Sequence, residues 1–208
     1  TSGSTGRPKG VQISHANALN LIQAEAHIYG IRPSDRVLQG FSTSFDASVK
    51  EIWMALHHGA ALVVGTKELM RSGPDFPHYL AVLGVTCLST VPTLLATLGA
   101  LEGCQYGDNG QMQLLPNVRL IITGGEACSK ELMARWATGG RRFFNTYGPT
   151  EATVIATYKE YGTTTFSTPS EQRITIGKPL PNYQCYVLDA HLNLLPPGAL
   201  GELSLIHI

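Results

Sequence analysis

The stretch VRLIITGGEACSKELMARWATGGRRFFNTYG, residues 118–148, decides the fold class. Residues 118–125 are a mostly apolar run that ends in two glycines, which is typical of a buried strand and the turn that follows it. A helix is expected to start at Ser129 and end at Trp136, and residues 141–148 form a second apolar run. A strand, a helix and a strand in this order predict a βαβ unit with parallel strands.

The same alternation continues upstream. The sequence predicts strands at residues 36–42, 60–65 and 85–90 and helices at residues 17–28, 46–58, 77–83 and 92–101. Ser14 is the expected N-cap of the first helix, and Val49, Ile52 and Leu56 share one stripe of the second. We therefore predict an α/β fold, in which a mostly parallel sheet carries helices on both faces.

After residue 148 the alternation of strand and helix patterns gives way to short strand patterns. Short β-type runs follow at residues 153–158, 173–177, 184–189 and 201–205, with turn signals at 179–182 and 196–198. We interpret residues 1–158 as an α/β core and residues 159–208 as the start of a β subdomain.

Composition excludes several classes of protein. The 208 residues include 15 basic and 15 acidic side chains, and this balance argues against a nucleic acid or membrane-surface partner. The longest apolar runs, such as residues 59–65, are too short to span a bilayer. Cysteines 87, 104, 128 and 185 form no CxxC pattern, so we expect reduced thiols in a cytoplasmic protein. Because Thr1 starts inside a motif, we expect the chain to be part of a longer protein.

The opening loop TSGSTGRPKG, residues 1–10, has no side chains suited to a core. It does not have the spacing of the nucleotide-binding P-loop, because Arg7 and Pro8 separate Gly6 from Lys9. Two interpretations remain open from the residues alone. The loop is either a flexible Ser/Gly-rich segment or a phosphate-binding loop in which backbone N–H groups and Lys9 face the anion.

Further motifs follow in a fixed order. They are FDASVKEIW at 45–53, NTYGPTEATV at 145–154, GKPLPNYQCYVLD at 177–189 and PPGALGEL at 196–203. Together with the opening loop they resemble the adenylate-forming superfamily, most closely the adenylation domains of nonribosomal peptide synthetases. The resemblance implies part of the large N-terminal domain of that fold. It also implies that an amino acid carboxylate attacks the α-phosphate of ATP, pyrophosphate leaves, and the aminoacyl group passes to a carrier-protein thiol. Phosphopantetheinyl carrier and condensation domains are the implied partners.

The resemblance also implies a nucleotide site that binds ATP with Mg²⁺. The phosphate loop would comprise Thr1, Ser2, Gly3, Ser4, Thr5, Gly6 and Lys9. The segment along the adenine would comprise Gly124, Gly125, Glu126 and Ala127, and the second nucleotide segment Asn145, Thr146, Tyr147, Gly148 and Thr150. Asn145 would pair with the adenine amino group, and Tyr147 would stack on the base or pack on the ribose. Lys9, Thr150 and Glu151 would be catalytic, with Thr150 on the α-phosphate and Glu151 on Mg²⁺.

In the same resemblance, Asp46 would bind the substrate's α-ammonium group and Phe45 would pack nearby. The side-chain pocket would be lined by Ala47, Lys50, Ser89, Ile122, Gly124, Thr146, Val154 and Ile155. Lys50 is the unusual member, because a buried ammonium needs an anion. We therefore expect a substrate with an acidic side chain, glutamate first, bound by Lys50 with help from Ser89 or Thr146. Glu51 lies about 100° around the helix from Lys50 and is not expected to be its partner.

Simpler interpretations stand beside these roles. Asp46 could be a helix N-cap, and Lys50 could form an exposed i,i+4 ion pair with Asp46. An acyl- or aryl-CoA ligase is one alternative function, although such an enzyme has no substrate ammonium for Asp46 to bind. A non-catalytic relative is another, although Thr5, Lys9 and Glu151 are all present. The resemblance places further site residues outside this chain, so we expect the chain alone to be inactive.

Overall fold

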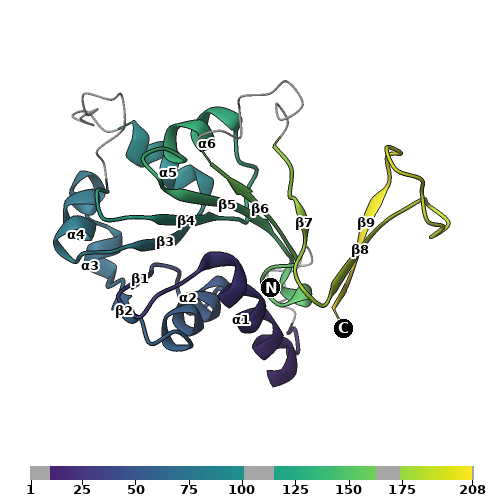
Figure 1. The fold of residues 1–208 in the computed structure, drawn as a ribbon, viewed down its shortest axis with the longest axis horizontal. Coiled ribbons are helices and arrows are strands. Elements are labelled where there is room, and N and C mark those ends of the chain that lie inside the picture. Colours follow the sequence, from purple (N-terminus) through teal and green to yellow (C-terminus); the bar gives the residue numbers. More distant parts are fainter. Residues whose placement is uncertain (1–9, 101–114, 163–173, 208) are drawn as a thin grey trace.

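The main sheet of the computed structural model confirms the predicted α/β class. The structure describes residues 10–100, 115–162 and 174–207, so Cys104 and the phosphate-loop residues up to Lys9 lie outside the described residues. Seven described strands form one sheet in the order β2-β1-β3-β4-β5-β6-β7 (Figure 1). They are β1 (Arg36–Gln39), β2 (Ala61–Val64), β3 (Cys87–Thr90), β4 (Leu120–Thr123), β5 (Arg142–Tyr147), β6 (Thr157–Tyr161) and β7 (Lys178–Pro179). The first five are parallel, and β6 and β7 add antiparallel strands at one edge.

Helices cover both faces of this sheet, as predicted. The helices are α1 (His15–Tyr29), α2 (Ala47–Leu56), α3 (Lys67–Met70), α4 (Phe76–Val82), α5 (Pro92–Gly99) and α6 (Lys130–Trp136), with a 3₁₀ turn, η1 (Gly73–Asp75), before α4. Helices α1 and α2 lie on one face and α3 to α6 on the other (Figure 1). Successive strand residues point to opposite faces, so Phe143 packs with Trp136 while Phe144 packs with Tyr29 and Met54. None of the described helices is both long and apolar enough to cross a membrane.

The predicted cap at Ser14 is confirmed, and Ser129, where a helix was expected to start, also caps one. The Ser14 hydroxyl accepts a hydrogen bond from the backbone N–H of Asn17 at 3.1 Å. The Ser129 hydroxyl accepts one from the N–H of Leu132 at 3.2 Å. Each bond satisfies a donor that the first helical turn leaves without an intrahelical partner.

Helix α2 does not turn its apolar stripe to the core. Val49 and Leu56 are 43% and 54% exposed. The buried residues of the helix are Ser48, Lys50, Glu51, Met54 and Ala55. An amphipathic pattern places polar residues outside, but here two charged side chains face inward, next to the ends of the parallel strands.

The predicted strand at 153–158 is wrong over its first four residues, because β6 begins at Thr157. Residues Thr150–Ala152 form a 3₁₀ turn, η2, and Thr153 and Val154 follow with φ values of 58° and 68°. β-branched residues rarely adopt positive φ, and such strain persists only where the surrounding structure imposes it. The Tyr183 hydroxyl imposes part of it by donating a hydrogen bond to the carbonyl of Ala152 at 3.1 Å.

The second sheet begins later than the sequence suggests. It pairs β8 (Tyr183–Leu188) with β9 (Glu202–His207) in antiparallel register. Because β6 and β7 belong to the main sheet, the change of sheet falls at Tyr183 rather than near residue 159.

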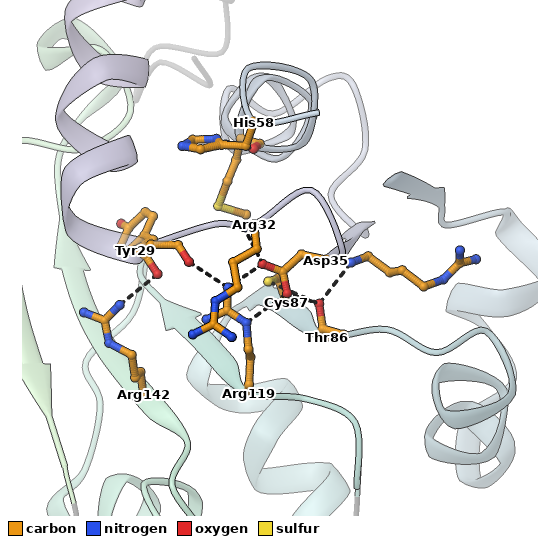
Figure 2. Close-up of polar contacts among 11 residues, drawn as sticks. Tyr29, Arg32, Asp35, His58, Thr86, Cys87, Arg119 and Arg142 are labelled. Atoms are coloured by element: carbon orange, nitrogen blue, oxygen red, sulfur yellow. Dashed lines mark hydrogen bonds and ion pairs between the residues drawn. The ribbon is translucent and has the colours of Figure 1, made fainter. Parts of the chain in front are cut away.

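The C-terminal end of α1 is fixed to the sheet by two arginines (Figure 2). Arg119 donates to the carbonyl of Gly30 at 2.8 Å and pairs with Asp35. Arg142, the first residue of β5, donates to the carbonyls of Ile28 and Tyr29 at 2.8 Å each. These guanidinium groups satisfy carbonyls that the last helical turn leaves open, so α1 has a defined position beside α2.

Candidate functional site

Two neighbouring cavities lie at the carboxyl ends of β3, β4 and β5, where ligands bind in open α/β sheets. The first has a volume of ≈450 Å³ and is lined by Gly125–Cys128, Asn145–Pro149 and Ile174–Ile176. The second has a volume of ≈420 Å³ and is bounded by α2, the end of β3 and the same strand-end loops. Gly125, Glu126, Thr146 and Gly148 line both cavities, so the two spaces adjoin.

In the first cavity, Asn145 is held in one orientation. Its side chain is 6% exposed, and Nδ2 donates to the carbonyl of Thr175 at 3.0 Å. Its side-chain oxygen is thereby the atom left to accept a hydrogen bond from a ligand amino group. Tyr147 ends β5 and is 42% exposed at the wall of the same cavity. The predicted residues Gly125, Glu126 and Ala127 also line it.

Two features of this cavity were not predicted. The carboxylate of Glu126 accepts from the backbone N–H of Thr93 at 3.1 Å and from its hydroxyl, so it holds the start of α5. The carboxylate of Glu126 is therefore engaged by α5, and the backbone of Glu126 is the part that borders the cavity. Residues 174–176 form one wall, although the sequence there shows only a short β-type run with no site motif.

Gly124 and Gly148 let the two strand-end loops approach each other. A Cβ at Gly124 would lie 2.7 Å from the Thr146 hydroxyl oxygen. A Cβ at Gly148 would lie 2.6 Å from the backbone nitrogen of Ala156 and 2.7 Å from the Cα of Ile155. Those neighbours are mainly backbone atoms, and moving them would cost free energy. Only glycine therefore fits at these two positions.

We therefore expect Gly148→Ala to lower the free energy of unfolding by about 1–3 kcal/mol, since it overpacks a rigid contact. Denaturant titration of the full-length protein that contains this chain measures the change. Gly10→Ala is the matched control, because a Cβ at Gly10 meets nothing within 4 Å. Equal stability of the two variants would contradict this account of Gly148.

All but one of the residues expected in the amino acid pocket line the second cavity. They are Phe45, Asp46, Ala47, Lys50, Ser89, Gly124, Thr146, Val154 and Ile155. Ile122 is instead fully buried in the core beneath α1 and α2, beside Phe144. Phe41, Thr90 and Val91 also line the cavity and were not predicted.

Lys50 faces into the protein. It is 4% exposed, and its Nζ donates to the Ser89 hydroxyl oxygen at 2.7 Å. The alternative of an exposed ion pair with Asp46 is therefore wrong. Within the described ranges, no carboxylate comes within ion-pair distance of the Lys50 ammonium.

Three acidic residues nevertheless lie close enough to act on Lys50 through space: Glu25, Glu51 and Asp46. Burial raises the pKa of Glu25 to about 8 and that of Glu51 to about 7, while burial lowers the pKa of Lys50. Glu51 accepts a hydrogen bond from the backbone N–H of Phe41 at 3.1 Å.

Glu25 was missed by the sequence analysis. It is 2% exposed on α1, and its Oε1 has no hydrogen-bond partner among the described residues. The Tyr29 hydroxyl acts on it from one turn further along α1 but is itself without a well-formed hydrogen bond. A signal was present, since Leu21, Ala24 and Glu25 share one helix stripe and an acid in an apolar stripe points to a special role.

The hydroxyls of the second cavity are not equivalent. Thr146 Oγ1 donates to the carbonyl of Thr123 at 2.7 Å, so its proton is not available to a substrate carboxylate. Ser89 accepts from Lys50 and keeps its own proton to donate. Asp46 occupies the N-cap position of α2, but its side chain makes no cap hydrogen bond within the described residues.

Thr150 and Glu151 lie in the η2 turn. Thr150 is half-buried and lines a smaller cavity of ≈100 Å³ together with Asp46, Lys50 and Val154. Glu151 is exposed and lines none of the cavities described above. In the part of the chain that the structure describes, no group of three or more His, Cys, Asp or Glu residues could hold a metal ion. A single free carboxylate suits Mg²⁺ only where ligand phosphates supply the other oxygens.

Comparison with known proteins gives a consistent result. The sequence profile of the family described as AMP-binding enzyme matches residues 1–206. The chain is 40% identical over 203 residues to bacitracin synthase 3 of Bacillus licheniformis, in a match that covers 98% of this chain and 3% of that protein. It is 40% identical over 207 residues to delta-poly-L-ornithine synthetase of Acinetobacter baumannii, covering 99% of this chain and 14% of that protein.

Solved structures agree. The nonribosomal peptide synthetase FmoA3 superposes with a TM-score of 0.83 at 29% identity, covering 95% of this chain and 21% of that one. The Vibrio cholerae adenylation domain AlmE, solved with glycyl-adenosine-5'-phosphate, superposes with a TM-score of 0.83 at 25% identity, covering 98% and 37%. The chain thus spans between 3% and 37% of the length of these four proteins. It belongs to the AMP-binding enzyme family and corresponds to part of an adenylation domain of the nonribosomal peptide synthetase type.

Proposed function

We propose that the protein containing this chain activates an amino acid with ATP, forming an aminoacyl adenylate and pyrophosphate. The observation that carries this proposal is the pair of adjoining cavities, one with Asp46 at its wall and the other with Asn145 and Tyr147. An amino acid in the second cavity and an adenosine in the first would meet at Gly125, Thr146 and Gly148. The amino acid carboxylate would then lie beside the α-phosphate that it attacks.

Each residue would have a separate role in binding the two substrates. Asp46 binds the α-ammonium group, Asn145 accepts from the adenine amino group, and Tyr147 packs on the nucleoside. Thr150 and Lys9 bind phosphate oxygens, and Glu151 would hold Mg²⁺, which neutralises phosphate charge when bound. No general base is required, because the attacking carboxylate is already ionised at neutral pH. The chain's contribution is positioning and charge neutralisation.

The side-chain pocket favours an acidic substrate, with glutamate as the first choice. The Lys50 ammonium is buried at the cavity wall, and Ser89 is placed to donate a second hydrogen bond to the same carboxylate. A phosphopantetheinyl carrier domain would accept the aminoacyl group, and a condensation domain would use it. We expect the isolated chain to be inactive without the remainder of the adenylation domain.

ATP–pyrophosphate exchange by the full-length protein, run with every proteinogenic amino acid and a panel of fatty and aryl acids, tests the proposal. We expect exchange with amino acids, strongest with glutamate or aspartate. Exchange with fatty or aryl acids alone would identify an acyl- or aryl-CoA ligase instead. ATP binding without any exchange would identify a non-catalytic relative.

A further inference from the structure

A buried acid from a different helix lies near the second cavity, which we call the amino acid cavity after its proposed ligand. Lys50 on α2 lines the cavity, and Glu25, which is buried on α1, acts on Lys50 through space. The two helices meet at this point, because Leu21 and Ile22 of α1 line a smaller cavity together with Lys50. The two groups interact electrostatically, but Nζ and the carboxylate are too far apart for a direct ion pair. The ammonium instead donates a hydrogen bond to the neutral Ser89 hydroxyl, and among the described residues Oε1 of Glu25 has no hydrogen-bond partner. Glu25 is therefore close enough to influence the charge of the pocket without blocking Lys50.

We propose that Glu25 is a specificity-determining residue of the amino acid site, and that its carboxyl group takes up a proton when Lys50 binds the side-chain carboxylate of a substrate. This inference rests on the proposed adenylation of an acidic amino acid. It concerns a positioning residue that acts through Lys50 and does not itself touch the substrate.

The charges explain why a proton should move. With Glu25 ionised, its negative charge offsets that of the Lys50 ammonium, and a substrate carboxylate gains little on entering. With Glu25 protonated, the Lys50 ammonium loses one of the negative charges that offset it, and a buried ammonium then attracts an anion more strongly. A substrate carboxylate therefore favours the protonated form of Glu25, and the proton comes from solvent. Burial already holds the pKa of Glu25 at about 8, so little free energy separates the two forms near neutral pH.

The other titratable groups around this pair can be separated from Glu25. Glu51 and Asp46 act on Lys50 from α2 and its N-terminal flank. Tyr29 acts on Glu25 from α1 and is itself influenced by Tyr158 on β6, and Tyr183 on β8 is influenced by Glu25. Burial raises the pKa of Tyr29 well above its ordinary value and that of Tyr183 to about 12, so both hydroxyls stay neutral below pH 9.

The direction of the pH effect follows. Below pH 8 Glu25 is mostly protonated, and preference for an acidic substrate is fully present. As pH rises through the pKa of Glu25, more of the Glu25 carboxyl groups are ionised before the substrate binds. Binding of glutamate then requires the uptake of a proton from solvent, where the proton concentration is falling. We expect the ratio of kcat/KM for glutamate to that for glutamine to fall by up to about tenfold for each pH unit above 8. Glutamine is the matched neutral substrate, because it has the same shape without the charge.

Calorimetry on the full-length protein measures the proton directly. Glutamate and glutamine are titrated at pH 8.5 in two buffers of different ionisation enthalpy. We expect uptake of up to about one proton with glutamate and none with glutamine. Glu25→Gln should abolish the uptake, while Glu51→Gln, the same change on α2, should retain it. Absence of uptake with glutamate, unchanged uptake in Glu25→Gln, or its loss only in Glu51→Gln would each overturn the proposal.

Exchange kinetics from pH 6.5 to 9.5 separate Glu25 from Lys50. We expect a flat glutamate-to-glutamine ratio in Glu25→Gln. If deprotonation of Lys50 caused the glutamate-to-glutamine ratio to fall, the ratio would still fall in Glu25→Gln. It would do so at lower pH, because Glu25 raises the pKa of Lys50. That result would overturn the inference. Exchange only with amino acids other than acidic ones would also overturn it and leave adenylation standing, whereas no exchange with any amino acid would remove the proposed function itself.

Discussion

Replacing Lys50 with glutamate is expected to abolish exchange with acidic amino acids and to create exchange with lysine or ornithine. The substitution removes the only ammonium among the described residues at the wall of the amino acid cavity. It also places a fourth carboxyl group beside Glu25, Glu51 and Asp46, which already act on this position. Breaking a buried charge contact commonly costs about 2–5 kcal/mol, so we expect kcat/KM for glutamate to fall about 100-fold or more.

Two further variants isolate the cause of this effect. Lys50→Met removes the charge but keeps the length of the side chain, and it should lose glutamate exchange without gaining lysine exchange. Lys67→Glu reverses a charge on exposed α3, away from the cavities described above, and should leave the preference unchanged. Strong exchange of the unaltered protein with an apolar amino acid, and none with acidic ones, would contradict the role given to Lys50.

Glu151→Gln is expected to abolish adenylate formation while the fold stays intact. The exposed carboxylate follows Thr150 in the η2 turn, where loss of its charge would remove the proposed Mg²⁺ ligand but no packing. Loss of one preorganised electrostatic contact typically lowers kcat by about 10²–10³-fold, and an exposed substitution changes stability by less than about 0.5 kcal/mol.

Pyrophosphate exchange at several Mg²⁺ concentrations and denaturant unfolding provide the two readouts for Glu151→Gln. Glu202→Gln, an equally conservative change at an exposed position on β9, serves as the control. An unchanged rate with unchanged Mg²⁺ dependence would remove Glu151 from the site.

The repeated pattern of strand and helix was predictable, because parallel strands buried on both faces need unbroken apolar runs such as residues 118–123. The caps at Ser14 and Ser129 were predictable because they depend on neighbouring backbone groups alone. The left-handed Thr153 and Val154 were not, since β-branched residues favour strands. There the hydrogen bond from Tyr183 and the close approach allowed by Gly148 override local propensity.

Site residues that belong to a sequence motif could be predicted, whereas those brought together only by the fold could not. Asp46 and Lys50 belong to one motif, whereas Ser89 lies 39 residues after Lys50, and family resemblance was needed to group it with them. Glu25 belongs to no motif, and only the packing of α1 against α2 brings it close enough to act on Lys50. Ile122 was expected in the pocket from the resemblance but does not line it. Its side chain lies on the core side of a strand whose end borders the cavity.

The arginine contacts at the end of α1 have a consequence for the order of folding. Arg119 and Arg142 follow the carbonyls that they bind by 89 and 113 residues. Contacts between such distant positions form late, since a long loop must close first. During synthesis, α1 leaves the ribosome long before either guanidinium exists, so its last turn has no partner until β4 and β5 have been made. We therefore expect the Glu25 side of the amino acid cavity to be among the last parts of the nascent chain to become ordered.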